Sequence, residues 1–147
     1  MTAAGDDERP FRPRFARAVT LTIGAVVLVL TTLLVAALPD VPWGDRAGIG
    51  LVGLAVVWFC WREAAVVARP DAGGLTVRNL VVTRRLEWAQ VVDVRFGEGR
   101  PWVQLDLADG DTLPVMAIQR ADGAAARREA RRLATLVARH TATAADD

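Results

Sequence analysis

The sequence predicts an α+β protein in which a transmembrane helical hairpin precedes a curved antiparallel sheet capped by one C-terminal helix. Three observations indicate this fold class. Two apolar runs lie before Arg62, short segments of alternating polarity follow, and the last segment has the repeat of an amphipathic helix. The 147 residues carry a formal net charge of +1, so the overall charge favours no class of partner.

Two apolar runs predict the hairpin, which we place at residues 16–62. Ala18–Leu38 has no charged residue and would be about 30 Å long as a helix, enough to cross the hydrocarbon core of a bilayer. Ala47–Trp61 would cover only about 22 Å. The flanking Arg46 and Arg62 can extend to the headgroups, and nearby tryptophans suit the interface.

Small residues of the second run leave two interpretations open. Gly48, Gly50 and Gly53 either permit close helix contact or only tune flexibility. Cys60, the single cysteine, is interpreted as a small apolar residue. One cysteine cannot form an internal disulfide or a multi-cysteine metal site.

Arginines surround the hairpin on one side, whereas the turn between the runs carries one Arg and two Asp. The positive-inside rule therefore predicts a multi-pass cell-membrane protein with both termini and the C-terminal domain cytoplasmic. The alternative is a signal peptide cleaved near Val35-Ala36-Ala37. The flanking arginines are Arg9, Arg12, Arg14, Arg17, Arg62 and Arg69.

Six β-strands are expected after the hairpin, from the alternation of apolar and polar residues and the turn signals between segments. Asn79 is interpreted as a turn residue, Trp88 as a core residue, and Pro114 as the mark of an edge or strand end. The expected strands cover residues 64–69, 75–78, 81–86, 92–96, 102–107 and 112–116.

The last element is predicted to be a helix from an N-cap at Asp122 to about His140, where an imidazolium would suit the helix dipole. Its apolar stripe should cover the sheet, with arginines on the other side. We place this domain at residues 63–141, with disordered ends at 1–15 and 142–147. The stripe comprises Ala126, Ala130, Leu133 and Val137, and the basic face Arg127, Arg128, Arg131, Arg132 and Arg139.

Six short motifs in this region resemble a known family in their order and spacing. They are Gly74–Asn79, Arg85–Trp88, Val91–Phe96, Pro101-Trp102, Ala108–Gly110 and Pro114–Gln119. Over about residues 62–140 the chain resembles the bacterial PH-domain family typified by the actinobacterial low molecular weight protein antigen. The resemblance implies a PH-like domain behind a two-helix membrane hairpin, and it implies no known reaction.

The sequence predicts no catalytic, cofactor or metal site and no enzyme. One histidine and one cysteine cannot supply the usual nucleophile–base pairs or soft metal sites. Nucleic-acid binding is not expected, because the arginines lack interleaved aromatic residues. The resemblance implies that a phosphoinositide site would carry a basic cluster around the first hairpin. That loop, residues 69–74, holds one Arg and one Asp, so specific inositol-phosphate binding is not expected.

The predicted function is a membrane-anchored PH-like interaction module that docks a partner protein at the inner face of the cell membrane. The alternative is a module that senses anionic lipids. The expected partners are the bilayer, a membrane protein and, weakly, anionic lipid. The basic helix face either contacts headgroups or is a solvated surface. Trp102 either packs across strands or contacts the membrane or a partner. The candidate interaction or lipid-facing residues are Arg127, Arg128, Arg131, Arg132 and Trp102.

Overall fold

The computed structural model describes residues 8–97 and 99–145, which form two compact units. Residues 8–15 and 66–145 make one unit, and residues 16–65 make the other. Glu98 lies in the segment between the strands expected at residues 92–96 and 102–107, and it is outside the described residues. Residues 1–7 and 146–147, which belong to the predicted disordered ends, also lie outside the described residues.

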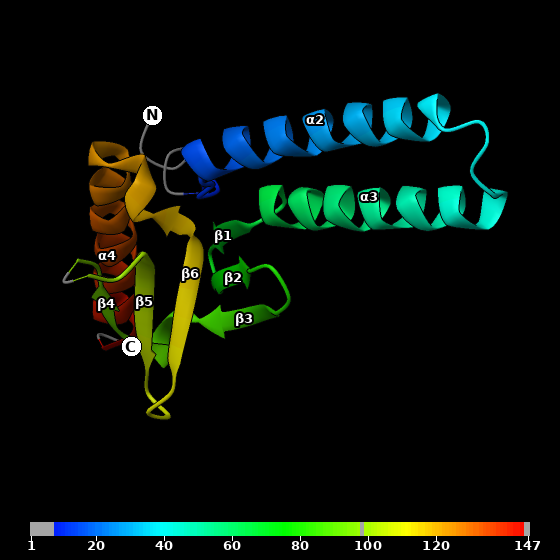
Figure 1. The fold of residues 1–147 in the computed structure, drawn as a ribbon. Coiled ribbons are helices and arrows are strands. Elements are labelled where there is room, and N and C mark those ends of the chain that lie inside the picture. Colours follow the sequence, from blue (N-terminus) through cyan, green and yellow to red (C-terminus); the bar gives the residue numbers. More distant parts are fainter. Residues whose placement is uncertain (1–7, 98, 146–147) are drawn as a thin grey trace. The chain divides into compact units, whose positions relative to one another are not determined.

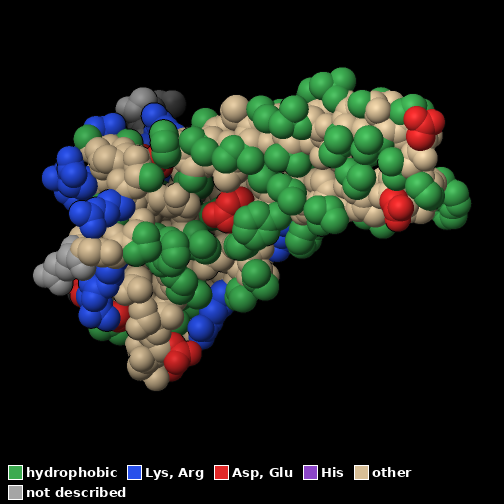
Figure 2. All heavy atoms as spheres, viewed as in Figure 1, with side chains coloured by type: hydrophobic (Ala, Val, Ile, Leu, Met, Phe, Trp, Pro, Cys, Tyr) green, Lys and Arg blue, Asp and Glu red, His purple; other side chains and the backbone are tan. Residues whose placement is uncertain are grey.

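The unit of residues 16–65 contains two helices, α2 (Phe15–Ala37) and α3 (Trp43–Ala64). Each is long and apolar enough to cross a membrane by length and composition. Helix α3 is longer than the predicted run, because its polar ends are also helical. Large apolar side chains along both helices are exposed, including Leu30 and Leu51. Figure 2 shows many hydrophobic side chains on the visible surface of α2 and α3.

Helices α2 and α3 approach each other closely at Gly53. A Cβ atom built on Gly53 would lie 2.4 Å from Thr31 Oγ1, and one built on Gly24 would lie 3.2 Å from Cys60 Cβ. Among the described residues, no atom lies within 4 Å of such a Cβ at Gly48 or Gly50. The close-contact interpretation is therefore confirmed for Gly53 alone, and Gly24 is a second contact point that the sequence analysis missed.

The other unit contains two three-stranded antiparallel sheets and helix α4 (Ala124–Ala145), and Figure 1 shows α4 lying along β4. All six expected strands are present, and the α+β fold class is confirmed. The first strand starts later than predicted because Ala64 is still helical. The sheets have the orders β1 (Val67–Asp71), β2 (Gly74–Arg78), β3 (Thr83–Glu87) and β4 (Val91–Arg95), β5 (Trp102–Leu107), β6 (Thr112–Gln119).

Helix α4 buries the apolar stripe expected from the sequence, together with Leu136. It begins after a short 3-10 turn, η2 (Arg120–Asp122), and after Gly123, whose φ is 57°. Asp122 is therefore not its N-cap. The helix also continues past His140, so the expected position of His140 at the helix end is wrong. Its ring instead stacks on Trp88, with centroids 4.8 Å apart.

Trp88 is buried, as expected, and opens a second 3-10 turn, η1 (Trp88–Gln90). The core packs around it between the strands and α4. It is formed by apolar side chains that alternate along the strands, such as Leu75 and Val77 on β2 and Val103 and Leu105 on β5.

Residues 9–15 differ from the predicted disordered N-terminus, because they pack into this unit. Phe11 is 1% exposed and belongs to the core. Its N–H donates to Ala68 O at 2.8 Å, and Ala68 N–H donates to Phe11 O at 3.1 Å. Strand β1 is the edge of its sheet, so this bridge covers part of an open edge.

Asn79 is more than the expected turn residue. It is buried, and its side chain reaches β6, the edge of the other sheet. Its Nδ2 donates to Pro114 O at 2.7 Å, and its Oδ1 accepts from Met116 N–H at 3.1 Å. The side-chain amide therefore pairs with the open edge of β6 as a neighbouring strand would. The prediction of an edge position for Pro114 is confirmed.

Candidate functional site

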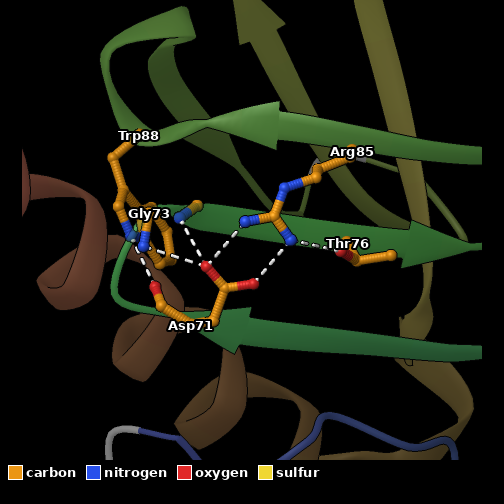
Figure 3. Close-up of polar contacts among 6 residues, drawn as sticks. Asp71, Gly73, Thr76, Arg85 and Trp88 are labelled. Carbon is orange, nitrogen blue, oxygen red and sulfur yellow. Dashed lines mark hydrogen bonds and ion pairs between the residues drawn. The ribbon is translucent and has the colours of Figure 1, made fainter.

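Hydrogen-bond donors at the β1–β2 hairpin are paired with the hairpin's own acidic residue, Asp71 (Figure 3). Asp71 accepts hydrogen bonds from the Arg85 guanidinium, at 2.7 and 3.0 Å, and from the N–H groups of Gly73 and Gly74. The hydrogen bond from Arg85 is the largest cause that lowers the pKa of Asp71 below its ordinary value, and the two amides add to it. Trp88 Nε1 donates to the carbonyl oxygen of Asp71.

These bonds use the polar groups that a phosphate would need at this hairpin. The amides of Gly73 and Gly74 point at a carboxylate, and Arg85 is paired with it. The neighbouring Arg84 lies within 3.7 Å of carboxylates in the β5–β6 turn. The hydrogen-bond donors of the hairpin are therefore paired within the domain, and we interpret the hairpin as a structural element.

Arg132, one of the predicted candidates on α4, is also part of the fold. Its guanidinium carbon lies 3.9 Å from the centroid of the Phe11 ring, a cation–π distance. Its Nη2 donates to Arg9 O at 2.6 Å, and its Nε lies 3.3 Å from Glu129. Glu129 also pairs with the side chain of Arg9. Arg132 thus holds the N-terminal segment against α4.

The other predicted candidates lie at three different places in the structure. Arg127 and Arg131 line a hollow between α4 and β4, together with Arg120, which the sequence analysis did not single out. Arg128 is exposed and is not among the residues lining that hollow. Trp102 is half-buried at the start of β5, where it pairs with Gln119.

The hollow continues into a groove between β4 and α4. The first hollow has a volume of about 480 Å³ and a second has about 450 Å³, and both are lined by Val94 and Ala134. The second is lined further by apolar residues, including Val91 and Val137. We call the two together the β4–α4 groove. Arginines gather where α4 begins, as Figure 2 shows, so the groove has a basic end and an apolar end.

Strand β4 forms one wall of the groove and is an edge strand whose neighbour in the sheet is β5. The register shifts between Val91 and Asp93, and Val92 is 65% exposed. In a strand over residues 92–96, Val92 would share the inward face of Val94 and Phe96, but a bulge turns Val92 out of the ladder. The local signal was the pair Val91-Val92, which a regular alternation cannot bury on one face.

Among residues 8–97 and 99–145, no group of three or more His, Cys, Asp or Glu side chains could hold a metal ion. The chemistry that the groove offers is apolar contact, guanidinium groups and an open strand edge. These features suit non-covalent recognition.

Comparisons with known proteins give the same assignment as the resemblance. The family described as "Bacterial PH domain" matches residues 64–135. Uncharacterized proteins of Mycobacterium tuberculosis and Mycobacterium bovis are 35% identical over 129 residues, which cover 83% of this chain and 84% of each relative. No solved structure matches the chain. On this similarity, and on its two antiparallel sheets closed by a C-terminal helix, the chain belongs to the bacterial PH-domain family.

Proposed function

We propose that this protein is a non-catalytic docking module, held at the inner face of the cell membrane by α2 and α3, that binds a partner protein in the β4–α4 groove. The observation that carries the proposal is the groove itself. It combines an apolar floor, an edge strand and arginines that make no ion pair within residues 8–97 and 99–145. Arginine is enriched at protein interfaces, and the buried core of an interface is more apolar than the rest of the surface.

Membrane anchoring is supported by the exposed apolar surface of α2 and α3. Leu30, Leu33 and Leu51 are 60–67% exposed, and a continuous surface of this kind is unfavourable in water. The packing of residues 9–15 supports a topology in which both ends of the hairpin leave the bilayer on one side. It also supports retention of α2, since cleavage near Ala37 would separate Phe11 from the domain core.

The topology is tested by reporter fusions in bacterial cells. A reporter active only in the cytoplasm is expected to be active when fused after Asp147 and inactive when inserted beside Pro42, in the turn between α2 and α3. A reporter active only outside the cytoplasm serves as the reciprocal control. Activity of this second reporter at Asp147 would contradict the proposed orientation.

Docking in the groove is tested by photo-crosslinking of the full chain in intact cells. A photoreactive amino acid at Ala134, in the groove, is expected to give a discrete protease-sensitive adduct. The matched control is the same amino acid at Thr135, which is exposed on α4 and is not among the groove-lining residues. The adduct should disappear in Arg127→Gln/Arg131→Gln.

Three results would contradict the docking proposal. Equal adducts at both positions would mean that the groove is not selective. Absence of an adduct at Ala134 would mean that nothing docks there. A protease-resistant adduct of lipid mass would favour the anionic-lipid sensor instead.

A further inference from the structure

We propose that the β4–α4 groove takes an extended peptide segment whose acidic side chains lie at the basic end and which adds to β4 as an antiparallel strand. This inference rests on the proposed docking function and names the chemistry of the occupant. It follows from three independent properties of the groove: a backbone edge, a basic end whose arginines make no ion pair within residues 8–97 and 99–145, and an apolar floor.

The backbone of β4 presents hydrogen-bonding groups on its open side. Leu107 N–H donates to Asp111 O across the β5–β6 pair. By the alternation of an antiparallel ladder, Leu105 therefore also directs its backbone to β6. Val94 is the partner of Leu105, so its N–H and C=O face away from β5, where another strand could pair with them.

A local contact agrees with this orientation. Val94 N–H donates to Asp93 Oδ1 at 2.8 Å. The Asp93 side chain therefore covers one donor of the open edge, as charged side chains on edge strands often do. An added strand would replace the carboxylate of Asp93 with its own carbonyl oxygen.

The charge of the groove favours an acidic occupant. Arg120, Arg127 and Arg131 are exposed and line its basic end. Within residues 8–97 and 99–145 these three make no ion pair, whereas other arginines do, including Arg9, Arg84, Arg85, Arg95 and Arg132. Arginine binds carboxylates with paired hydrogen bonds, and β4 ends beside these guanidinium groups.

The floor of the groove favours apolar side chains at the other end. Val91, Val94 and Val137 line the second hollow with small alanines of α4. A strand lying against β4 points every second side chain to one face, so alternate residues of the occupant would contact this floor. Antiparallel addition then requires acidic residues first and apolar residues later in the peptide.

A lipid headgroup would use only part of this site. It would bind guanidinium groups, but neither the edge of β4 nor the apolar hollow beyond Val94 would have a partner. An extended peptide uses all three features, as strand-adding ligands do when backbone bonds give affinity and alternate side chains give selectivity.

The test uses the full chain in nanodiscs of phosphatidylcholine and the fluorescent probe acetyl-Asp-Asp-Thr-Val-Thr-Val-Lys(fluorescein)-amide. Fluorescence anisotropy is expected to show saturable binding. Arg127→Gln and Arg131→Gln should each weaken the Kd by about threefold or more, and Asp93→Ala should strengthen it by about threefold. Arg128→Gln, a change of the same kind on the same helix but outside the groove, should leave the Kd unchanged.

Two modified probes test strand addition itself. A probe N-methylated at alternate amides on the β4-facing side should bind about tenfold more weakly, because it loses backbone hydrogen bonds. A probe with the reversed sequence should also bind weakly. Equal binding by the methylated probe, or an equal effect of Arg128→Gln and Arg127→Gln, would overturn the inference.

The remaining outcomes separate this inference from the proposed function. Displacement of the probe by glycerol phosphate as readily as by unlabelled peptide would assign the groove to headgroups and overturn the inference. A protein adduct at Ala134 without probe binding would overturn the peptide assignment and leave the docking function standing. Absence of both would overturn both.

Discussion

Replacing Phe11 with Ala is expected to destabilise the domain of residues 66–145 by about 3–5 kcal/mol, the usual cost of removing a buried aromatic side chain. Phe11 is 1% exposed and lies under the Arg132 guanidinium at 3.9 Å. Its loss would leave a cavity and remove the cation–π partner of Arg132. Since small domains are stabilised by only about 5–15 kcal/mol, this is a large fraction of the total.

The same reasoning applies to a truncated chain. A chain that starts at Arg62, near the predicted domain boundary at residue 63, would lack Phe11 and the bridge to Ala68. It is expected to unfold with little cooperativity. A chain in which residues 8–15 are joined to residue 66 by a flexible linker should recover a cooperative transition.

Hydrogen–deuterium exchange of the full chain in micelles measures the effect of the substitution. Phe11→Ala should accelerate exchange in β1 and α4. Phe15→Ala is the matched control, because Phe15 is 58% exposed and should change exchange little there. Equal exchange in the two variants would show that the N-terminal segment does not stabilise the domain.

Most of the fold follows from local patterns in the sequence. Strand β5 alternates buried and half-buried residues along its whole length, and α4 buries the four residues expected from a helical repeat. Such periodicities are properties of neighbouring residues, so they can be recognised in the sequence before the tertiary contacts are known. The two helices of the hairpin were predictable for the same reason, from the length and apolarity of their runs.

The contacts that the sequence does not reveal join residues far apart in the chain. Phe11 pairs with Ala68, although the segment of α2 and α3 separates them in the sequence. Arg132 contacts Arg9, which is 123 residues away in the sequence. Before the fold is known, Phe11 lies in a short polar segment and Arg132 is one of several arginines on a basic helix face. Arg120 was missed as a groove residue for the same reason, because only the tertiary structure brings it beside Arg127.

Replacing Asn79 with Ala is expected to lower the free energy of unfolding by about 2–4 kcal/mol. The sequence predicts only a turn residue here, whereas in the structure the Asn79 side chain binds the edge of β6. The substitution removes two hydrogen bonds and leaves Pro114 O and Met116 N–H without the partner that Asn79 provides. An unsatisfied buried polar group typically costs about 1–3 kcal/mol. The edge of β6 would also lose the group that pairs with it.

Asn79→Leu separates hydrogen bonding from packing. Leu fills the space of the amide but cannot donate or accept, so it should be at least as destabilising as Ala. Unfolding of the full chain in micelles, followed by the near-ultraviolet circular dichroism of its tryptophans, which include the buried Trp88, measures stability. Amide exchange at Met116 reports the lost bond directly and should become faster in both variants. Recovery of wild-type stability by Leu would mean that Asn79 contributes by packing rather than by binding the edge of β6.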